Sequence, residues 1–318
     1  MIKYYLTHFT ILAIFSIIVI MPDEIQLSNL LQKISDEFPD LKWQKGIYVD
    51  SGKVNHIVIL DSSLIFRFPR KKEYEEFLNL EIDLLNVLDK HISLRIPHYT
   101  HIAKDRSFGG YTFIQGEPLS MEMLDNMDNS EQEKITDSIS IFLSELHNIS
   151  LDNFSHLNIR KDMWNNTNFL SLENQVFEYL HPRLSKEEIS RIEKHLEKSK
   201  TLLQDKVNPV LIHQDIYGRN ILINSNKVSG IIDFNQPSIA DPAQDFEGLM
   251  EFGEEFVGKI YEKYKGPKND NFLLRTKLYF DRMALWTMVG SLQGYTGTFE
   301  DGYQMFKDRF YKYNNNYN

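Results

Sequence analysis

The chain has no cysteine among its 318 residues. This absence excludes disulfides, thiolate catalysis and zinc–thiolate sites, and it suits a reducing compartment. An excess of positive charge is also missing, because 35 lysines and arginines face 45 aspartates and glutamates, a formal net charge of −10. A general nucleic-acid binder needs the opposite balance, so we expect no nucleic acid and a neutral or cationic partner.

Long apolar runs are also scarce. The one that is present is "YYLTHFTILAIFSIIVI", residues 4–20. It is long enough for a membrane anchor, but it has no small-residue cleavage site and stops at Met21, a plausible translation start. We interpret residues 1–21 either as an anchor or as a mis-assigned start, and membrane contact is expected only in the first case. The remaining chain is apolar enough to form a core, with 42% hydrophobic residues.

The periodicity of apolar residues changes along the chain. Helical spacing over 25–38 is followed by strand-like runs at "GIYVD", "HIVIL" and "LIFRFP", a helix across about 72–91 and a further strand at "YTFIQG". Beyond Gly116 the pattern is mainly helical. We therefore predict an α+β chain with two lobes, a small antiparallel sheet with one main helix over 22–115 and a larger helical lobe over 116–318. Ligands commonly bind between such lobes.

Two helices of the larger lobe are predicted to begin with capping boxes. The first pairs Ser130 with Glu133 and the second pairs Ser185 with Glu188. In each, a serine is followed three residues later by a glutamate and then by an apolar-periodic run, which is the signature of a helix N-terminus.

Polar side chains interrupt the apolar stretch "LIHQDIYGRNILINSNKVSGIIDF", residues 211–234. "NILI" and "KVSGIIDF" flank turn residues, so we predict a hairpin in which Ile223 pairs with Val228. That pairing brings Asp233 beside Asn220, with Asp215 in a loop just upstream. Oxygen ligands without cysteine suit Mg²⁺. We expect Asn220 and Asp233 to hold the metal.

The division of chemistry in this stretch follows from position. Asp215, set slightly apart from the metal pair, is expected to accept the proton of an incoming hydroxyl. His213 is expected to orient the loop by hydrogen bonding more than to react. The alternative for each acid or amide taken singly is a turn cap, a common use of aspartate and asparagine.

The predicted helix of the smaller lobe has a charged residue within its apolar face. Phe77, Glu81, Leu84 and Leu88 share one helical face, so Glu81 lies in an apolar stripe and needs a partner. Arg67, in the neighbouring strand, is the predicted partner, either with its guanidinium reaching nucleotide phosphates or as a purely structural ion pair. Ser51 and Gly52 permit a backbone loop close to phosphates, although a Ser-Gly pair is commonly a plain turn.

These motifs together resemble the aminoglycoside phosphotransferase family, over most of residues 25–290. "HQDIYGRN" is similar to the family's catalytic loop, "IIDF" to its metal-binding segment and "IADPAQDF" to the stretch that follows. "RFPR" with the Glu81 helix is similar to the basic strand residue and its glutamate. The nearest likeness is to the aminoglycoside 2''-phosphotransferase branch and its macrolide relatives. Arginine replaces the usual lysine at Arg67, and Asn235 stands where many relatives have glycine.

The resemblance implies a protein-kinase-like fold and Mg²⁺-dependent transfer of the γ-phosphate of ATP or GTP to a hydroxyl. It places the nucleotide base on the backbone of Thr112, Phe113, Ile114 and Gln115, between the lobes. Catalysis with a nucleoside triphosphate further implies a cytoplasmic location, tethered or free.

The acceptor is expected to be a cationic antibiotic, an aminoglycoside. Glu247, Glu251, Glu254 and Glu255 have the spacing of one acidic helical face, which suits several ammonium groups, although a solvated charged face is the alternative. The resemblance adds Trp286 to the substrate side, with core packing as its alternative. The stretch after Trp286, "TMVGSLQG", is neutral, which leaves room for a macrolide or a metabolite alcohol such as choline. A non-catalytic nucleotide-binding module is the rival of another class.

Overall fold

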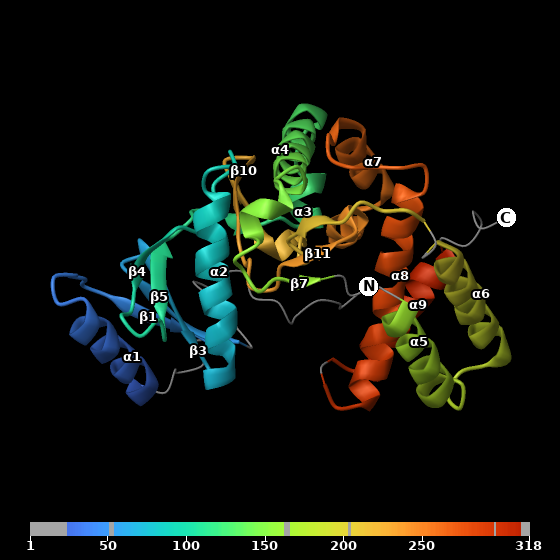
Figure 1. The fold of residues 1–318 in the computed structure, drawn as a ribbon, viewed down its shortest axis with the longest axis horizontal. Helices are drawn as coiled ribbons and strands as arrows, with labels where there is room; N and C mark the ends of the chain where they lie inside the picture. Colours follow the sequence, from blue (N-terminus) through green and yellow to red (C-terminus); the bar gives the residue numbers. More distant parts are fainter. Residues whose placement is uncertain (1–23, 51–53, 162–165, 203–204, 296, 313–318) are drawn as a thin grey trace.

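A computed structural model describes residues 24–50, 54–161, 166–202, 205–295 and 297–312. The chain has the expected bilobal α+β architecture, with a five-stranded sheet in the smaller lobe and a mainly helical larger lobe (Figure 1). Within the described ranges no helix is both long and apolar enough to cross a membrane. The apolar segment 4–20 lies outside them.

The sheet of the smaller lobe is antiparallel throughout and has the order β1-β2-β3-β5-β4. A short 3₁₀ turn, η2, leads into the main helix of the lobe. The element bounds are α1 Glu24–Glu37, β1 Gly46–Val49, β2 Asn55–Leu60, β3 Leu64–Pro69, η2 Lys72–Tyr74, α2 Glu75–Leu88, β4 Tyr99–Ile102 and β5 Gly109–Thr112.

Strand alternation explains why the two long helices of this lobe cover opposite faces of the sheet (Figure 1). Phe66 and Phe68 of β3 pack in the cluster that contains Leu30 and Ile34 of α1. Ile65, one residue before Phe66, belongs instead to the cluster that contains the buried face of α2. Arg67 alternates to the α2 side as well, and this is what brings it to Glu81.

The predicted strand at 111–116 is wrong in its bounds, since β5 begins at Gly109 and ends at Thr112. Strand β4 was not expected. The sequence pattern of a strand is weak at the start of β5, because glycine lacks the β-branched side chain that is typical of strands. The glycines of β5 are required by close packing: a Cβ at Gly110 would lie 2.6 Å from the Phe66 ring.

The larger lobe consists of helices in two apolar clusters. One cluster joins α4 and α7 to the site region, and the other joins α5, η4, α6, α8 and α9. The bounds are α3 Met121–Asp125, α4 Asn129–His147, η3 Leu151–Phe154, α5 Asn166–Gln175, the π-helical turn η4 Val176–Leu180, α6 Lys186–Leu202, η6 Pro242–Phe246, η7 Gly248–Phe252, α7 Glu254–Lys263, α8 Phe272–Leu292 and α9 Phe299–Lys312.

One of the two predicted capping boxes is wrong. Helix α4 is capped by Asp128, whose side chain accepts from the N–H of Glu131, while Glu131 accepts from the N–H of Asp128 at 3.0 Å. An aspartate two residues upstream of Ser130 therefore takes the cap. The second box is confirmed, because the Ser185 N–H donates to the Glu188 carboxylate at 2.7 Å and the Glu188 N–H donates to Ser185 Oγ at 3.3 Å.

Two small sheets complete the larger lobe, and both border the site. One has the order β10-β9-β6 and the other β7-β11-β8. Their bounds are β6 Glu117–Pro118, β7 Arg160–Lys161, β8 Val210–Ile212, the 3₁₀ turn η5 Gly218–Asn220, β9 Ile221–Asn224, β10 Lys227–Ile231 and β11 Ser238–Ala240.

The predicted hairpin register is confirmed, because Ile223 pairs with Val228. Ser225 and Asn226 form a two-residue turn with φ of 51° and 57°. Positive φ at both turn residues matches the twist of the flanking strands. The register shifts between Val228 and Gly230, where Ser229 forms a bulge.

Candidate active site

The loop after β8 brings Asp215 and Asn220 into direct contact. The Asn220 amide donates from Nδ2 to the Asp215 carboxylate at 2.7 Å and to the Asp215 carbonyl at 2.8 Å. Asn220 is buried, and the Asp215 side chain keeps 29% of its surface exposed. Arg219 forms an ion pair with the same carboxylate. Asp215 is thus held from two sides and still open to a ligand.

The hairpin places Asp233 at the same end as Asn220. The N–H of Ile232 donates to the Asn220 carbonyl at 3.0 Å, which fixes the chain immediately before Asp233. Asp233 has a φ of 72°, in the left-handed region that few non-glycine residues adopt. Its carboxylate is 35% exposed. The structure therefore brings together the three side chains that the sequence places at separate points.

His213 ties the loop to the hairpin. Its Nδ1 accepts a hydrogen bond from the Asp215 N–H at 3.2 Å, and its Nε2–H donates to the Ile232 carbonyl at 3.1 Å. These partners require a neutral ring with the proton on Nε2. The ring packs edge-on against Phe234 with centroids 4.4 Å apart. Both ring nitrogens hold backbone groups, an arrangement that suits the predicted orienting role.

Asp245 holds the start of the loop after β8 by hydrogen bonds to its backbone. Its carboxylate accepts from the N–H groups of His213 at 2.8 Å and Gln214 at 2.6 Å. It also accepts from Nε2 of His147 at 3.0 Å, and Nδ1 of His147 accepts from the Tyr264 hydroxyl at 2.7 Å. Asp245 and His147 are almost fully buried. Sequence reasoning missed His147 and Tyr264, and the available signal was a lone histidine ending the apolar face of helix α4.

The electrostatics of Asp215 suit a proton acceptor. Burial raises the pKa of its carboxyl above the ordinary value, while Arg219 and the Asn220 amide oppose the increase. A carboxylate with a raised pKa takes up a proton more readily, and proximity to a hydroxyl would make it a general base.

Arg67, Glu81 and Asp233 connect the two lobes. Nη1 of Arg67 donates to both oxygens of Glu81 at 2.7 and 2.8 Å, and Nη2 donates to Asp233 at 3.1 Å. Glu81 is fully buried and also accepts from the Tyr99 hydroxyl and the Phe234 N–H, both at 3.3 Å. Burial raises the pKa of Glu81, and Arg67 counteracts this. The predicted Arg67–Glu81 pair is present, although Phe77 on the same helical face is exposed.

The oxygens left over at Asn220 and Asp233 fit a magnesium ion. Nδ2 of Asn220 and one oxygen of Asp233 are engaged in hydrogen bonds, whereas Oδ1 of Asn220 and the second Asp233 oxygen accept none from the described residues and could act as ligands. Among the residues that the structure describes, no three acidic, histidine or cysteine side chains gather closely enough to hold a metal. A hard ion bound by two protein oxygens would complete its shell with phosphate oxygens and water.

The residues expected to hold the nucleotide are only partly described. Ser51 and Gly52 lie outside the described ranges. Thr112 is exposed at the end of β5, whereas Phe113 and Ile114 are buried. The Phe113 N–H donates to the Ser63 carbonyl at 2.8 Å, so this amide is already used within the lobe.

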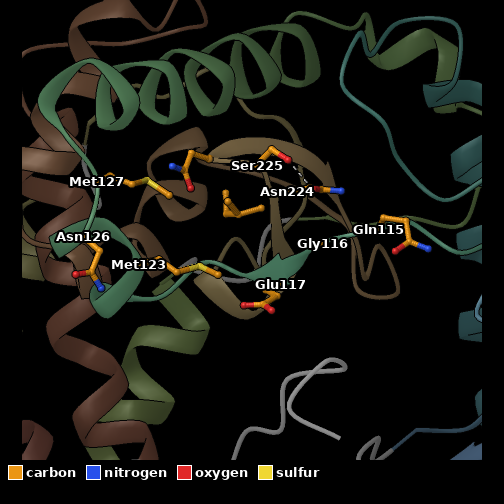
Figure 2. A pocket seen from close by; sticks show the side chains of 10 residues that line it. Gln115, Gly116, Glu117, Met123, Asn126, Met127, Asn224 and Ser225 are labelled. Carbon is orange, nitrogen blue, oxygen red and sulfur yellow. Dashed lines mark hydrogen bonds between the residues drawn. The ribbon is translucent and has the colours of Figure 1, made fainter. Parts of the chain in front are cut away.

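A cavity of about 440 Å³ lies beside the connection between the lobes (Figure 2). Of the segment expected to hold the base, only Gln115 lines it. Met123 and Met127 extend toward it from α3 and the turn that follows, and Asn224 and Ser225 border it from the hairpin turn. Since Asn220 and Asp233 lie at the open end of the hairpin, the cavity is at the opposite end from the predicted metal ligands.

The predicted single acidic helical face is wrong. Glu247 and Glu251 belong to the 3₁₀ region around η7, whereas Glu254 begins helix α7, and Gly253 separates them with a φ of 94°. The carboxylate of Glu247 is buried, accepts from the Tyr217 hydroxyl at 3.2 Å and pairs with Arg282 at 3.5 Å. Glu251 accepts from the Gly218 N–H at 2.6 Å.

Trp286 and the outer glutamates remain accessible. Trp286 lies on α8 with 36% of its surface exposed, so it is not a core residue. Glu254 and Glu255 are exposed, and Glu255 pairs with Lys259 at 2.8 Å. Of the predicted substrate residues, Glu247 and Glu251 contact the 217–219 loop, through their hydrogen bonds with Tyr217 and Gly218.

Comparisons with known proteins support a common architecture. The model of a family described as "Phosphotransferase enzyme family" matches residues 49–267. The structure is similar to a GDP complex of aminoglycoside 2'-phosphotransferase-IIIa, with TM-score 0.81, 22% identity and coverage of 89% of this chain and 98% of that chain. A GDP and kanamycin complex of an APH(2'') enzyme gives TM-score 0.79, 22% identity and coverage of 88% and 98%.

A macrolide phosphotransferase shares the fold as well. The macrolide 2'-phosphotransferase MphH from Brachybacterium faecium, as apoenzyme, is similar with TM-score 0.68 and 15% identity, covering 88% of this chain and 98% of that chain. At these identities the likeness is one of fold.

Proposed function

The chain belongs to the aminoglycoside phosphotransferase family, and from this membership together with its site we propose that it transfers the γ-phosphate of ATP or GTP to a hydroxyl of an aminoglycoside. The observation that carries the proposal is the meeting of Asp215, Asn220 and Asp233 at one end of a hairpin. Phosphoryl transfer needs a proton acceptor and oxygen ligands for a metal within one small space.

Each side chain has a role that follows from its contacts. Asp215 would accept the proton of the attacking hydroxyl, since its carboxylate is fixed and partly open. Asn220 and Asp233 would hold Mg²⁺, which when bound neutralises charge on the transferred phosphate. Arg67 would hold Asp233 in place and face the phosphates further back. His213 would keep the loop and the hairpin in register.

An aminoglycoside is the favoured acceptor for reasons of charge. The chain carries a net charge of −10, and exposed Glu254 and Glu255 follow Glu247 and Glu251 close to the 217–219 loop. Several ammonium groups would be attracted to such a region. Exposed Trp286 offers an apolar surface for a sugar ring. A kanamycin complex of a similar structure agrees with this proposal.

The alternative acceptor is a macrolide or a small metabolite alcohol such as choline. It is favoured by the neutral stretch after Trp286 and by the similarity to a macrolide phosphotransferase. The charge of the Glu247 carboxylate is already balanced by Arg282, which weakens the attraction of Glu247 for a cationic substrate.

The test is a panel of acceptors with each nucleotide. Purified protein is assayed for nucleoside diphosphate release with ATP and with GTP, each with Mg²⁺, against kanamycin-like, macrolide and choline-like compounds. We expect acceptor-dependent turnover with the aminoglycoside. Turnover only with an uncharged macrolide would reject the cationic acceptor, and no turnover with intact nucleotide binding would favour the non-catalytic module.

A matched pair of variants assigns the base. Asp215→Ala should lower kcat by about a hundredfold or more while nucleotide binding is nearly unchanged, because a general base contributes to the chemical step. Asp137→Ala removes a surface carboxylate that pairs with Lys263 and should retain the wild-type kcat. Equal kcat values for the two variants would remove Asp215 from the mechanism.

A further inference from the structure

Arg219 occupies a position beside the reaction centre that the proposed function has not used. It immediately precedes Asn220, and its guanidinium forms an ion pair with the Asp215 carboxylate. The guanidinium also lies over the Tyr217 ring, 4.4 Å from the centroid. The ion pair is partly open to solvent, with 40% of the Arg219 side chain and 29% of the Asp215 side chain exposed.

The two residues before Arg219 are anchored to the segment around η7. The Tyr217 hydroxyl donates to Glu247 at 3.2 Å, and the Gly218 N–H donates to Glu251 at 2.6 Å. Gly218 is packed so closely that a Cβ there would lie 2.3 Å from the Leu119 carbonyl. With its backbone fixed and its guanidinium stacked on Tyr217, Arg219 is directed toward Asp215 before any ligand arrives.

The geometry of in-line transfer places the reacting phosphorus near this guanidinium. The attacking oxygen must lie within hydrogen-bonding distance of Asp215, about 2.6–3.2 Å, and the same oxygen forms the new bond to phosphorus. The phosphoryl oxygens are then within a few ångströms of the group that pairs with Asp215. A guanidinium has five N–H donors in a fixed fork, more than one carboxylate oxygen can accept.

We propose that Arg219 is a further catalytic residue, whose guanidinium bridges the Asp215 carboxylate and the phosphoryl group during transfer. This inference rests on the proposed function. In the step, the hydroxyl proton passes to Asp215 and the hydroxyl oxygen bonds to the γ-phosphorus. The bond from phosphorus to the β–γ bridging oxygen breaks, and its electron pair leaves on the nucleoside diphosphate. Arg219 stays protonated and stabilises charge on the phosphoryl oxygens.

The test compares Arg219→Gln and Arg219→Lys with a matched control elsewhere on the surface. Arg191 makes similar contacts, since it pairs with Glu187 at 3.0 Å, four residues earlier, and lies 4.1 Å from the Tyr311 ring centroid, although it also donates to the Phe310 carbonyl at 3.2 Å. We expect Arg219→Gln to lower kcat by about a hundredfold, with the acceptor KM changed less than about threefold. Arg219→Lys should recover about a tenth to a half of wild-type kcat, and Arg191→Gln should retain all of it.

A binding measurement separates phosphate contact from a structural role. Affinities are measured by calorimetry with Mg²⁺, for the nucleoside diphosphate and for a triphosphate analogue with a nitrogen β–γ bridge. Arg219→Gln should weaken the triphosphate about tenfold more than the diphosphate, because only the triphosphate carries the group that Arg219 would touch. Arg191→Gln should leave the ratio unchanged.

The outcomes distinguish the two levels of inference. If wild type turns over nucleotide while Arg219→Gln keeps kcat and the affinity ratio within about twofold, the role of Arg219 is rejected and the proposed function survives. A parallel loss of affinity for both nucleotides, without rescue by lysine, also rejects it, because a distorted loop explains that result. A wild-type protein that neither binds nor consumes nucleotide overturns the proposed function and this inference together.

Discussion

Asp245 shows how one buried side chain can set the position of a loop. Its carboxylate accepts hydrogen bonds from two consecutive backbone N–H groups and from His147. An amide in its place has only one accepting oxygen, and its NH₂ group faces other donors. We therefore expect Asp245→Asn to lower the free energy of unfolding by about 2–4 kcal/mol, measured in urea, and to lower kcat at least tenfold.

The control for this substitution is Asp137→Asn. Asp137 pairs with Lys263 at the surface, and such exposed pairs contribute about 0–1 kcal/mol. An Asp245→Asn protein as stable as the control would show that the backbone of the 213–214 segment is held by something else.

Glu247 gives a prediction about pH. Burial raises its pKa from the ordinary 4.5 to about 7, against the opposing effect of Arg282. The folded state thus binds the proton more tightly than the unfolded chain does. The contribution of Glu247 to the free energy of unfolding falls as the pH rises from 4.5 to 7, by up to about 3 kcal/mol, and is constant above.

Glu247→Gln tests this sign, because glutamine is neutral at every pH. The Tm of the variant relative to wild type should increase between pH 5 and pH 7.5, on the order of several degrees. The attraction of Arg282 acts on the ionised carboxylate and is already included in the shifted pKa of Glu247, so the change of the Tm difference with pH is the informative quantity. A constant Tm difference across this range would show that Glu247 does not titrate there.

At the scale of elements, the 215–220 loop is packed against the backbone of the residue that follows β6. A Cβ at Gly218 would lie 2.3 Å from the Leu119 carbonyl oxygen, which a backbone atom cannot relieve by a rotamer change. We expect Gly218→Ala to lower the free energy of unfolding by about 1–3 kcal/mol and to reduce kcat more than tenfold, since Asp215 and Asn220 flank the displaced turn.

Gly258→Ala is the matched glycine substitution. Gly258 lies inside α7 with no atom within 4 Å of a built Cβ. Alanine is the better helix former there, so the variant should gain about 1 kcal/mol and retain activity. Both variants are compared by urea unfolding and by steady-state turnover, and the two stability changes should have opposite signs.

The elements also show what local sequence can and cannot specify. The pairing of Ile223 with Val228 in the β9–β10 hairpin was predicted correctly, because β-branched runs and turn residues are local signals, whereas the bulge at Ser229 was not predicted. The Arg67–Glu81 pair followed from a charge inside an apolar stripe. The strand with Gly109 and Gly110 gave no such signal, since its packing against Phe66 comes from another strand.

Contacts between segments that are distant in the sequence could not be predicted from the spacing of nearby residues. His147 meets Asp245 and Tyr264 from positions 98 and 117 residues away, and nothing near His147 in the sequence identifies these partners. The acidic face failed for a different reason. Gly253 breaks the helical register, so an i, i+4 pattern across it did not correspond to one surface.

At the scale of the whole molecule, a buried charge cluster links the lobes. Arg67 of β3 and Glu81 of α2 contact Asp233 and the Phe234 N–H of the larger lobe. Glu81→Leu leaves Arg67 buried without its main partner. We expect this variant to lose about 3–5 kcal/mol in free energy of unfolding, measured in urea.

The double variant Arg67→Met/Glu81→Leu separates stability from activity. It replaces the pair with apolar side chains of similar size, so it should recover most of the lost stability. Turnover should remain far below wild type, because Asp233 then lacks the guanidinium that fixes it. A double variant as unstable as Glu81→Leu would indicate that the cluster is required for folding and not only for orienting Asp233.

The two-residue turn at Ser225 and Asn226 is a position where related sequences can differ in length. The turn is exposed and lies at the far end of the hairpin from Asn220 and Asp233. An insertion at this turn lengthens the loop while β9 and β10 keep their pairing. Deletion of one residue between Gly230 and Asp233 instead moves Asp233 away from Asn220, because the Ile232 N–H bond to the Asn220 carbonyl fixes the chain immediately before it. Gaps among functional descendants should therefore gather at the turn and be absent from the three positions before Asp233.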